Sequence, residues 1–339
     1  MLYYTGLLVF VFATYGVTNL IRNKETAKKI FFFAVCVAVI LFQGFRSFSV
    51  GVDLVGYIPA FSNIGTMHHF KLEYQNYEAG YIVLNRVLYM LGFNERQFLI
   101  AIAAIVQVPI FYTMSKYSEK PLISVLWYFS FGNFVMTFSG LRQSIAMALC
   151  FLAYFFIKQK KLIPFILLII FASLFHSSAL FCLLLYPAYF IKITKKSVIL
   201  ALGTYAVVFI MRSKLLEVLS KLYYEKGVEK QNNGAYTMLI VYLLLFIVSF
   251  LGTYEDKDFI GLRNILFLIS VIYSFAPMHN FVTRISFPLS LYMTIFIPKL
   301  IDSFWIKPKW LYYGLCCIVL SCCYYYFVGS FNTLPFSFG

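Results

Sequence analysis

The segment from 45 to 81 carries residue types that could perform acid–base chemistry on an anionic substrate. Arg46, Asp53 and Tyr57 follow an apolar run, and Glu78 lies further along in the sequence YEAGY. A carboxylate could act as a general base, and a guanidinium could hold an anion. The alternative is a loop in which the acids and the arginine simply pair with each other.

The sequence FSGLRQSIAMAL (138–149) predicts a helix whose first turn could bind an anion. Ser139 and Gly140 are typical of a helix start, and Arg142 and Gln143 then lie in the first turn. Free backbone N–H groups and the positive end of the helix dipole attract phosphate there. The alternative is an arginine that reaches to lipid headgroups. We favour the anion site because the short loops of this chain carry mostly lysine.

Histidines supply a third group of candidates. His176 lies in LFHSSAL (174–180) and could bind phosphate, act as a base or hydrogen-bond a carbonyl. Ser177 or Ser178 could cap the next helix, which explains the serines without a function.

A fourth group lies further along the chain. His279 and Arg284 lie in MHNFVTRISF (278–287), where Arg284 could complete a basic pocket.

The adjacent histidines His68 and His69 are the remaining metal-ligand candidates. They have no carboxylate at metal-ligand spacing, so we expect neither a metal nor a cofactor.

The composition places these residues in a membrane protein. The 339 residues are 62% hydrophobic and only 12% charged, whereas a soluble domain needs about 25% charged residues. Apolar runs long enough to cross a hydrocarbon core of about 30 Å recur from end to end. We therefore predict a single polytopic membrane domain over residues 1–339. The net charge of +15 comes from lysine clusters between apolar runs, which is typical of cytoplasmic loops and not of nucleic-acid binding.

Short basic loops between the apolar runs predict which helix ends lie in the cytoplasm. They are RNKETAKK (22–29), KYSEK (116–120), KQKK (158–161), KITKK (192–196), EDKD (255–258) and 299–309. The expected spans are 2–20, 30–44, 97–115, 121–138, 141–157, 162–175, 178–191, 197–211, 235–253, 259–276, 284–301 and 310–328. We therefore expect an all-α protein with about twelve transmembrane helices and both termini outside.

The sequence YIVLNRVLYMLGF (81–93) decides the topology. As a span it would put the next three basic loops outside, against the positive-inside rule. It is short and has Arg86 in its middle, so we predict a re-entrant or interfacial helix. The outer loops are then 44–96 and 212–234, the second predicted to be an amphipathic surface helix. We expect the loop 44–96 to fold back over the outer face and place its carboxylates near the outer arginines, because unpaired charges at the edge of a membrane bundle are costly.

These motifs, in this order, resemble the EpsG family, a branch of the Wzy-type polymerases of exopolysaccharide, capsule and O-antigen. The resemblance covers about residues 1–190. The matching positions are Arg46, Asp53, Tyr57, Glu78, Gly80, Arg142, Gln143, His176 and Ser178. Val52 and Leu54 depart from the family pattern, which weakens the case for Asp53. The C-terminal half matches only in span pattern and in Arg284.

The resemblance implies a reaction and a place for it. Such polymerases transfer a growing glycan from undecaprenyl pyrophosphate to a lipid-linked repeat unit, at the outer leaflet of the bacterial cytoplasmic membrane. It implies a fold like that of the multi-span lipid-donor (GT-C-like) glycosyltransferases, with a flippase and a chain-length regulator as partners. Arg142 and Arg284, with Arg46 assisting, would stabilise the pyrophosphate without a metal. Tyr57 and Gln143 would contact substrate, and the base would be Glu78 or Asp53 ahead of His176.

Other functions fit part of this pattern. A flippase for the same lipid-linked glycans should show paired halves and polar residues through the bilayer depth, whereas most spans here are nearly free of charge. A ligase that joins finished glycan to a carrier would have a similar sequence. A scaffold in an export complex would need only arginines that reach the headgroups.

Overall fold

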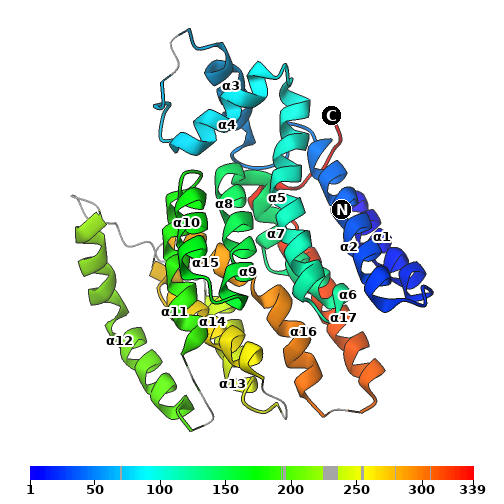
Figure 1. The fold of residues 1–339 in the computed structure, drawn as a ribbon, viewed down its shortest axis with the longest axis vertical. Coiled ribbons are helices and arrows are strands. Elements are labelled where there is room, and N and C mark those ends of the chain that lie inside the picture. The colour runs from blue at the N-terminus through cyan, green and yellow to red at the C-terminus, as the bar shows by residue number, and fades with distance from the viewer. Residues whose placement is uncertain are drawn as a thin grey trace. The chain divides into compact units, whose positions relative to one another are not determined.

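The computed structural model of the protein consists of helices joined by short loops (Figure 1). It describes the chain except residues 69–70, 192, 194–195, 224–235, 253–255, 279 and 306. The α-helices are α1 Leu2–Asn19, α2 Lys24–Gly44, α3 Leu54–Thr66, α4 Ala79–Met90, α5 Glu95–Tyr117, α6 Pro121–Ser130, α7 Asn133–Ser139, α8 Leu141–Leu152, α9 Tyr154–Lys158, α10 Leu162–Ser173, α11 Leu185–Phe190, α12 Val198–Tyr223, α13 Tyr236–Val248, α14 Lys257–Tyr273, α15 Asn280–Ser290, α16 Met293–Ser303 and α17 Lys309–Phe327. Short 3-10 helices are η1 Ser177–Leu184, η2 Ala276–Met278 and η3 Ser330–Asn332. No strand occurs in the described residues, so the expected all-α class is confirmed.

The chain divides into two compact units. Unit 1 is Met1–Leu180 with Ile306–Gly339, and unit 2 is Phe181–Trp305. Each unit has its own helix packing, with α2, α5 and α8 central to the first and α14 central to the second. That residues 1–339 act as one membrane domain remains a prediction.

Helices long and apolar enough to cross a membrane are α2, α5, α8 with α9, the part of α12 from Val198 to Val218, α14 with η2, and α17. Within the described residues, these six candidate spans become up to eight if the bent pairs α6–α7 and α15–α16 each form one span. The other expected spans fall on α1, α10, η1 with α11, and α13. The count of about twelve is not reached because α10 and α13, with 12 and 13 residues, are short, and a hydrocarbon core of about 30 Å needs about 20. In α1, tyrosines, threonines and glycines dilute the apolar residues.

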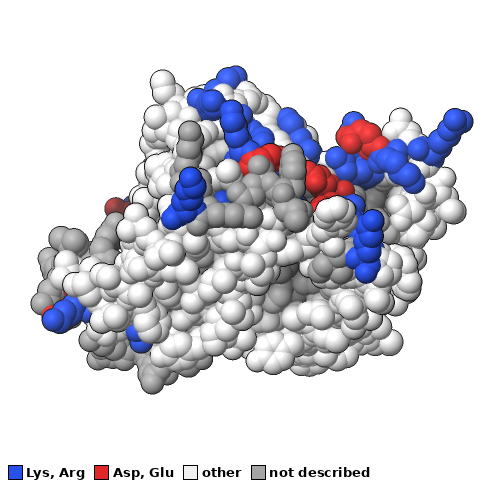
Figure 2. Space-filling view, turned by 90° about the horizontal axis from the view of Figure 1, so that it is seen from below, with Lys and Arg blue, Asp and Glu red and all other residues white. Residues whose placement is uncertain are grey.

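The surface is that of a membrane protein. Only 11% of the spanning windows of α12 and α17 is buried within the protein, and Ile199 on α12 is 80% exposed. Such apolar helix faces need lipid to cover them. Figure 2 shows a face on which Lys and Arg gather in a few places, with Asp and Glu beside some of them, while most of the rest is uncharged.

In unit 1, α2 and α5 lie side by side and run in opposite directions. Near one end, a Cβ built on Gly44 would lie only 2.6 Å from Ile100 Cγ1, so the two backbones approach closely there. Near the other end, the rings of Phe32 and Phe111 are 6.4 Å apart. The helix pair therefore carries the chain from one end of the unit to the other and back.

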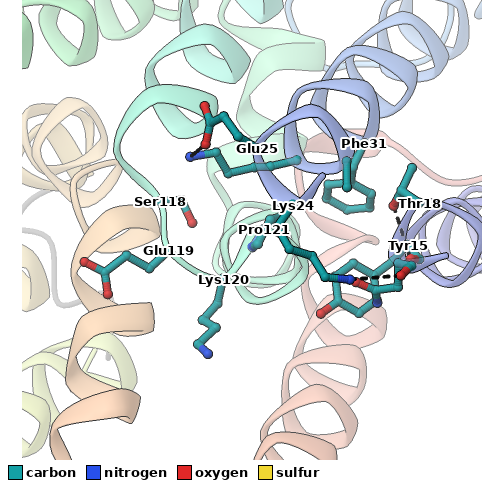
Figure 3. Close-up of a pocket in the computed structure, with 12 residues that line it drawn as sticks. Tyr15, Thr18, Lys24, Glu25, Phe31, Ser118, Glu119, Lys120 and Pro121 are labelled. Atoms are coloured by element: carbon teal, nitrogen blue, oxygen red, sulfur yellow. Dashed lines mark hydrogen bonds and ion pairs between the residues drawn. The ribbon is translucent and has the colours of Figure 1, made fainter. Parts of the chain in front are cut away.

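Three basic loops of unit 1 share one end of it. The first two line a cavity of about 480 Å³, to which the first contributes Lys24 and Lys28 and the second Lys120; Figure 3 shows Lys24 and Lys120 there. Lys116 Nζ lies 4.1 Å from the ring centroid of Phe155, which brings the third loop to the same end. Since α2 leads away from this end and α5 returns to it, residues 45–94 lie at the opposite end. The helix α4, with 12 residues, spans only about 18 Å, which supports the prediction that 81–93 does not cross the membrane.

The end of unit 1 that carries residues 45–94 is tied together by the C-terminal segment. The backbone N–H groups of Ser47, Gly51 and Val52 donate to the carbonyls of Ser337, Asn332 and Phe331 at 2.8, 3.0 and 3.1 Å. This short ladder fixes the path of the chain between α2 and α3.

In unit 2, α14 packs against α11, α13, α15 and α16. The helix α12 continues to Tyr223, so the first half of the predicted surface helix at 212–234 extends the preceding span. Residues 212–223 are helical, as predicted, whereas their place on the outer surface stays a prediction, and residues 224–235 lie outside the described part of the chain.

Candidate functional site

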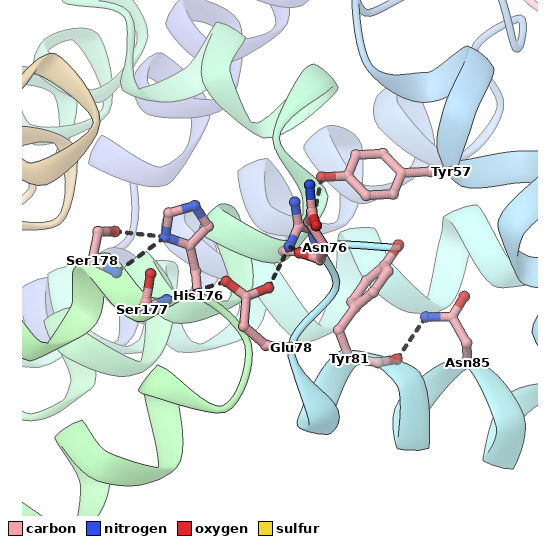
Figure 4. A network of polar contacts seen from close by, with 9 residues as sticks. Tyr57, Asn76, Glu78, Tyr81, Asn85, His176, Ser177 and Ser178 are labelled. Atoms are coloured by element: carbon pink, nitrogen blue, oxygen red, sulfur yellow. Dashed lines mark hydrogen bonds and ion pairs between the residues drawn. The ribbon is translucent and has the colours of Figure 1, made fainter. Parts of the chain in front are cut away.

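Arg142 is the centre of a polar cluster that includes Tyr57, Asn76 and Glu78, and Figure 4 shows how these three partners lie. It lies in the first turn of α8, as predicted, just after the break between α7 and α8 at Gly140. Its NH1 contacts the carboxylate of Glu78 and donates to the backbone carbonyl of Asn76 at 2.9 Å. Its Nε donates to the Tyr57 hydroxyl at 3.3 Å. The side chains of Arg142 and Glu78 are 18% and 21% exposed, so the pair is accessible to a ligand but largely shielded from bulk water.

Glu78 connects three segments that are far apart in the sequence. One carboxylate oxygen contacts Arg142, and the other accepts the backbone N–H of Ser177 at 3.2 Å. The approach is possible because Gly80 has no side chain: its N–H donates to the Leu174 carbonyl at 2.9 Å, and a Cβ there would lie 2.7 Å from that oxygen. The glycine of the E-x-G motif thus has a packing role that places the glutamate.

His176 lies beside this bridge, and its ring is held by Ser178. The backbone N–H of Ser178 donates to Nδ1 at 3.3 Å, and the Ser178 hydroxyl lies 2.7 Å from the same nitrogen (Figure 4). An N–H donor at Nδ1 favours the tautomer with its proton on Nε2. His176 is therefore arranged as a hydrogen-bond donor through Nε2 and not as a general base at Nδ1.

Two tyrosines, Tyr57 and Tyr77, contact the guanidinium of Arg142, and two more pack against Tyr77. The ring of Tyr77 lies under the guanidinium, with 4.5 Å between the guanidinium carbon and the ring centroid. Tyr57, Tyr74 and Tyr81 contact Tyr77 at centroid distances of 5.7, 5.7 and 5.5 Å. Burial raises the pKa of Tyr77 to about 12 and also raises that of Tyr57, so both hydroxyls stay neutral at physiological pH.

Sequence reasoning selected Tyr57 but missed Asn76, Tyr77 and Ser177. Asn76 and Ser177 take part through backbone atoms, which residue types do not reveal. The three tyrosines at 74, 77 and 81 were a detectable signal, because their spacing brings them to one side of the α4 start.

Arg46 does not belong to the cluster. Its side chain is 1% exposed. Nε, NH1 and NH2 donate to the carbonyls of Val50, Gln43 and Phe138 at 3.2, 2.5 and 2.9 Å. The guanidinium therefore fixes the backbone around the α7–α8 break, and the expectation that it assists in pyrophosphate binding is withdrawn.

The remaining predicted residues lie in other environments. Asp53 is exposed at the N-terminus of α3 and makes no side-chain hydrogen bond or ion pair with any described residue. Gln143 is only 3% exposed and is buried under the first turn of α8. Arg284 is exposed on α15, in unit 2, and is not placed relative to Arg142. His279 lies outside the described residues.

Unit 2 has a second polar cluster that sequence reasoning did not select. Arg263 on α14 is fully buried, and its NH2 donates to the Ile193 carbonyl at 2.6 Å. Nearby, Asp258 accepts the Tyr189 hydroxyl at 2.5 Å and lies 3.4 Å from Lys299 Nζ. The signal was an arginine inside an apolar run, which normally has a specific partner. These contacts join α11, α14 and α16 at one end of unit 2.

Fold and site together define an all-helical membrane protein with a shielded arginine–glutamate pair at the end of its helix bundle. The comparison with protein-family models gives the family. The EpsG family model matches residues 29–338, so this chain belongs to the EpsG family of Wzy-type polysaccharide polymerase-like membrane proteins. The match extends through the C-terminal half, where the motifs alone had shown only a span pattern. No curated protein and no solved structure matches the chain.

Proposed function

We propose that this protein polymerises lipid-linked oligosaccharide repeat units. The donor is a glycan on undecaprenyl pyrophosphate, and the acceptor is a hydroxyl of a second lipid-linked unit. The acceptor oxygen bonds to the anomeric carbon, the bond from that carbon to the pyrophosphate breaks, and the pyrophosphate lipid leaves with the negative charge. The product is a glycan one repeat longer. Membership of the EpsG family supports this class of reaction.

The contact between Arg142 and Glu78 is the observation that carries the proposal. Negative charge develops on the leaving pyrophosphate, and a guanidinium in a partly dry site stabilises it. Arg142 lies in a first helical turn, whose dipole adds to this attraction. No metal or cofactor is needed in this scheme.

Pyrophosphate binding and proton removal are then coupled. In the contact with Arg142, one carboxylate oxygen of Glu78 is occupied by the guanidinium and cannot accept a proton from a hydroxyl. When pyrophosphate replaces Glu78 as the partner of Arg142, the carboxylate has a free oxygen. It is still held by the N–H of Ser177, and it can then accept the proton of the acceptor hydroxyl.

Other candidates take secondary parts in the proposal. The Tyr57 hydroxyl orients the guanidinium, and His176 donates a hydrogen bond to substrate through Nε2. Arg284 is kept as a second pyrophosphate ligand and Asp53 as the alternative base. Gln143, because it is buried, supports the first turn of α8.

We place the reaction at the outer face of a bacterial cytoplasmic membrane. The basic loops of unit 1 share the end opposite to the Arg142 cluster, and basic loops normally face the cytoplasm. Exopolysaccharide, capsule or O-antigen repeats are the substrate classes, and a flippase would supply them. A GT-C-like helix arrangement remains part of this proposal.

The glycan length distribution in a cell that lacks this protein tests the function. We expect single repeat units on lipid, restored to a ladder of chains by the wild-type gene and not by a gene encoding Arg142→Lys. Full-length chains that remain unattached would instead indicate a ligase. Repeat units trapped on the cytoplasmic leaflet would indicate a flippase.

A further inference from the structure

The geometry points to a second glycan-binding pocket, separate from the Arg142 cluster, that holds the distal sugars of a long acceptor or donor chain. The pocket lies between α3, the C-terminal end of α4 and the start of α5, and has a volume of about 460 Å³. That volume is within the range of small-ligand sites. The inference deepens the proposed function and rests on it only for the identity of the glycan.

The walls of the pocket are aromatic. Phe48, Phe61, Tyr89 and Phe93 line it. Phe61 is stacked on Phe98 at 4.4 Å and meets Tyr89 edge-on at 5.9 Å, so these rings are fixed before a ligand arrives. Rigid aromatic walls bind the C–H faces of a ligand at little cost in conformational entropy.

The polar groups of the pocket offer both donors and acceptors. Within the described part of the chain, one oxygen of Glu95 accepts the Ser62 hydroxyl at 3.2 Å, while the other makes no hydrogen bond. The amide NH2 of Asn94, which lines the pocket, is also without an acceptor there. Arg96 stacks over Phe48 at 4.6 Å and uses only NH1 for its hydrogen bonds. Its Nε and NH2 remain as donors.

This inventory favours a neutral polyhydroxyl ligand. The opposite charges of Glu95 and Arg96 cancel, so the pocket has no net attraction for an anion. A phosphate there would be repelled by the carboxylate as well as attracted by the guanidinium. A sugar hydroxyl both donates and accepts, and can therefore use the Glu95 oxygen and the Arg96 N–H groups together. Aromatic walls with a few convergent polar groups are the usual lining of small-molecule sites.

The position of the pocket suggests why it would matter. Glu78 precedes the first residue of α4, and Tyr89 lies at its last turn, so the two sites are separated by about 16 Å of helix. A chain of several sugars would bridge that distance, whereas one or two sugars would reach only one site. Binding at both sites would make long chains better substrates than short ones, because the second contact is intramolecular.

The pocket is tested by binding, which does not require turnover. The probe is the cell's own exported polysaccharide, hydrolysed and sorted by length, titrated into the full chain in lipid nanodiscs. For long fragments we expect Glu95→Gln and Phe93→Ala to raise Kd about tenfold, the loss of about 1.4 kcal/mol. Glu73→Gln, a matched change of an exposed carboxylate in the same outer segment, should leave Kd unchanged.

The outcomes separate this inference from the proposed function. Fragments that bind both pocket variants as tightly as wild type would overturn the pocket, whatever the polymerase assay shows. Direct binding of phosphocholine that is weakened in both pocket variants, with no binding of fragments, would show a lipid-headgroup site and overturn it as well. Length-dependent binding that needs Glu95, in a protein that makes no polymer, would support the glycan-binding pocket and contradict the proposed polymerase function.

Discussion

Arg142 and Glu78 neutralise each other in this structure, so neither is ready for its proposed task until a substrate arrives. The guanidinium of Arg142 contacts the Glu78 carboxylate, the Asn76 carbonyl, the Tyr57 hydroxyl and the ring of Tyr77. A pyrophosphate with two negatively charged groups can compete for it, while a neutral sugar cannot. In this proposal, Glu78 is released from Arg142 to act as the base only when a pyrophosphate group binds Arg142.

Arg142→Lys should lower polymer synthesis about tenfold to a hundredfold, although the charge is kept. An ammonium group cannot hold two phosphate oxygens with a planar fork. The measurement is polymer formed per molecule of protein, with Arg22→Lys in an exposed loop as the matched control. Normal polymer from the Arg142→Lys protein would reduce Arg142 to a structural contact.

Glu78→Gln should separate binding from chemistry. The amide oxygen can still accept the Ser177 N–H, but the base is lost, and general bases contribute about a hundredfold or more to rate. We expect kcat to fall by about that factor while the affinity for the pyrophosphate lipid is unchanged or higher, since Arg142 is no longer neutralised. A fall in affinity with unchanged kcat would assign Glu78 to substrate positioning.

At the scale of elements, the site depends on how closely α4 approaches the end of α10. Gly80 permits this approach, and the ladder between residues 47–52 and 331–337 holds the other side of the outer segment. Gly80 takes no part in the proposed chemistry but allows Glu78 to reach its position, while the ladder fixes the path of the chain between α2 and α3.

Gly80→Ala should therefore impair activity without removing any reacting group. Its Cβ would lie 2.7 Å from the Leu174 carbonyl oxygen, and relief of such overpacking typically costs about 1–3 kcal/mol. We expect lower thermal stability and reduced polymer. Gly16→Ala in α1, where a Cβ meets nothing within 4 Å, is the control and should change neither.

The sequence predicted that carboxylates of the segment 44–96 lie near the outer arginines, because unpaired charges at a membrane boundary are costly, and the contact between Glu78 and Arg142 agrees with this. It did not predict which acid meets which arginine. It could not predict the burial of Arg46. That burial depends on the contact of Arg46 with Phe138 and on the path of the chain after α2, which the C-terminal segment fixes. Both are contacts between residues far apart in the sequence. Likewise, hydropathy marked α10 and α13 as spans, but only the structure shows where their helices end.

For the whole molecule, the grouping of the basic loops of unit 1 at one end predicts the orientation in the membrane. In a background without the seven native cysteines, cysteine at position 73 should react with an impermeant reagent in intact spheroplasts. Cysteine at position 160 should not react. The reverse pattern would place the Arg142 cluster on the cytoplasmic face and exclude the proposed reaction there.

The most direct test of the account is synthesis by the purified protein alone. Wild-type protein in nanodiscs would be given lipid-linked single repeat units isolated from a cell that lacks it, and the products would be separated by length. We predict a ladder of chains that grows by one repeat per step, with free undecaprenyl pyrophosphate released in equal amount, and with both products lowered about tenfold to a hundredfold for Arg142→Lys. Unchanged single units with the wild-type protein, in a preparation shown to be folded, would contradict the claim that this chain is the polymerase.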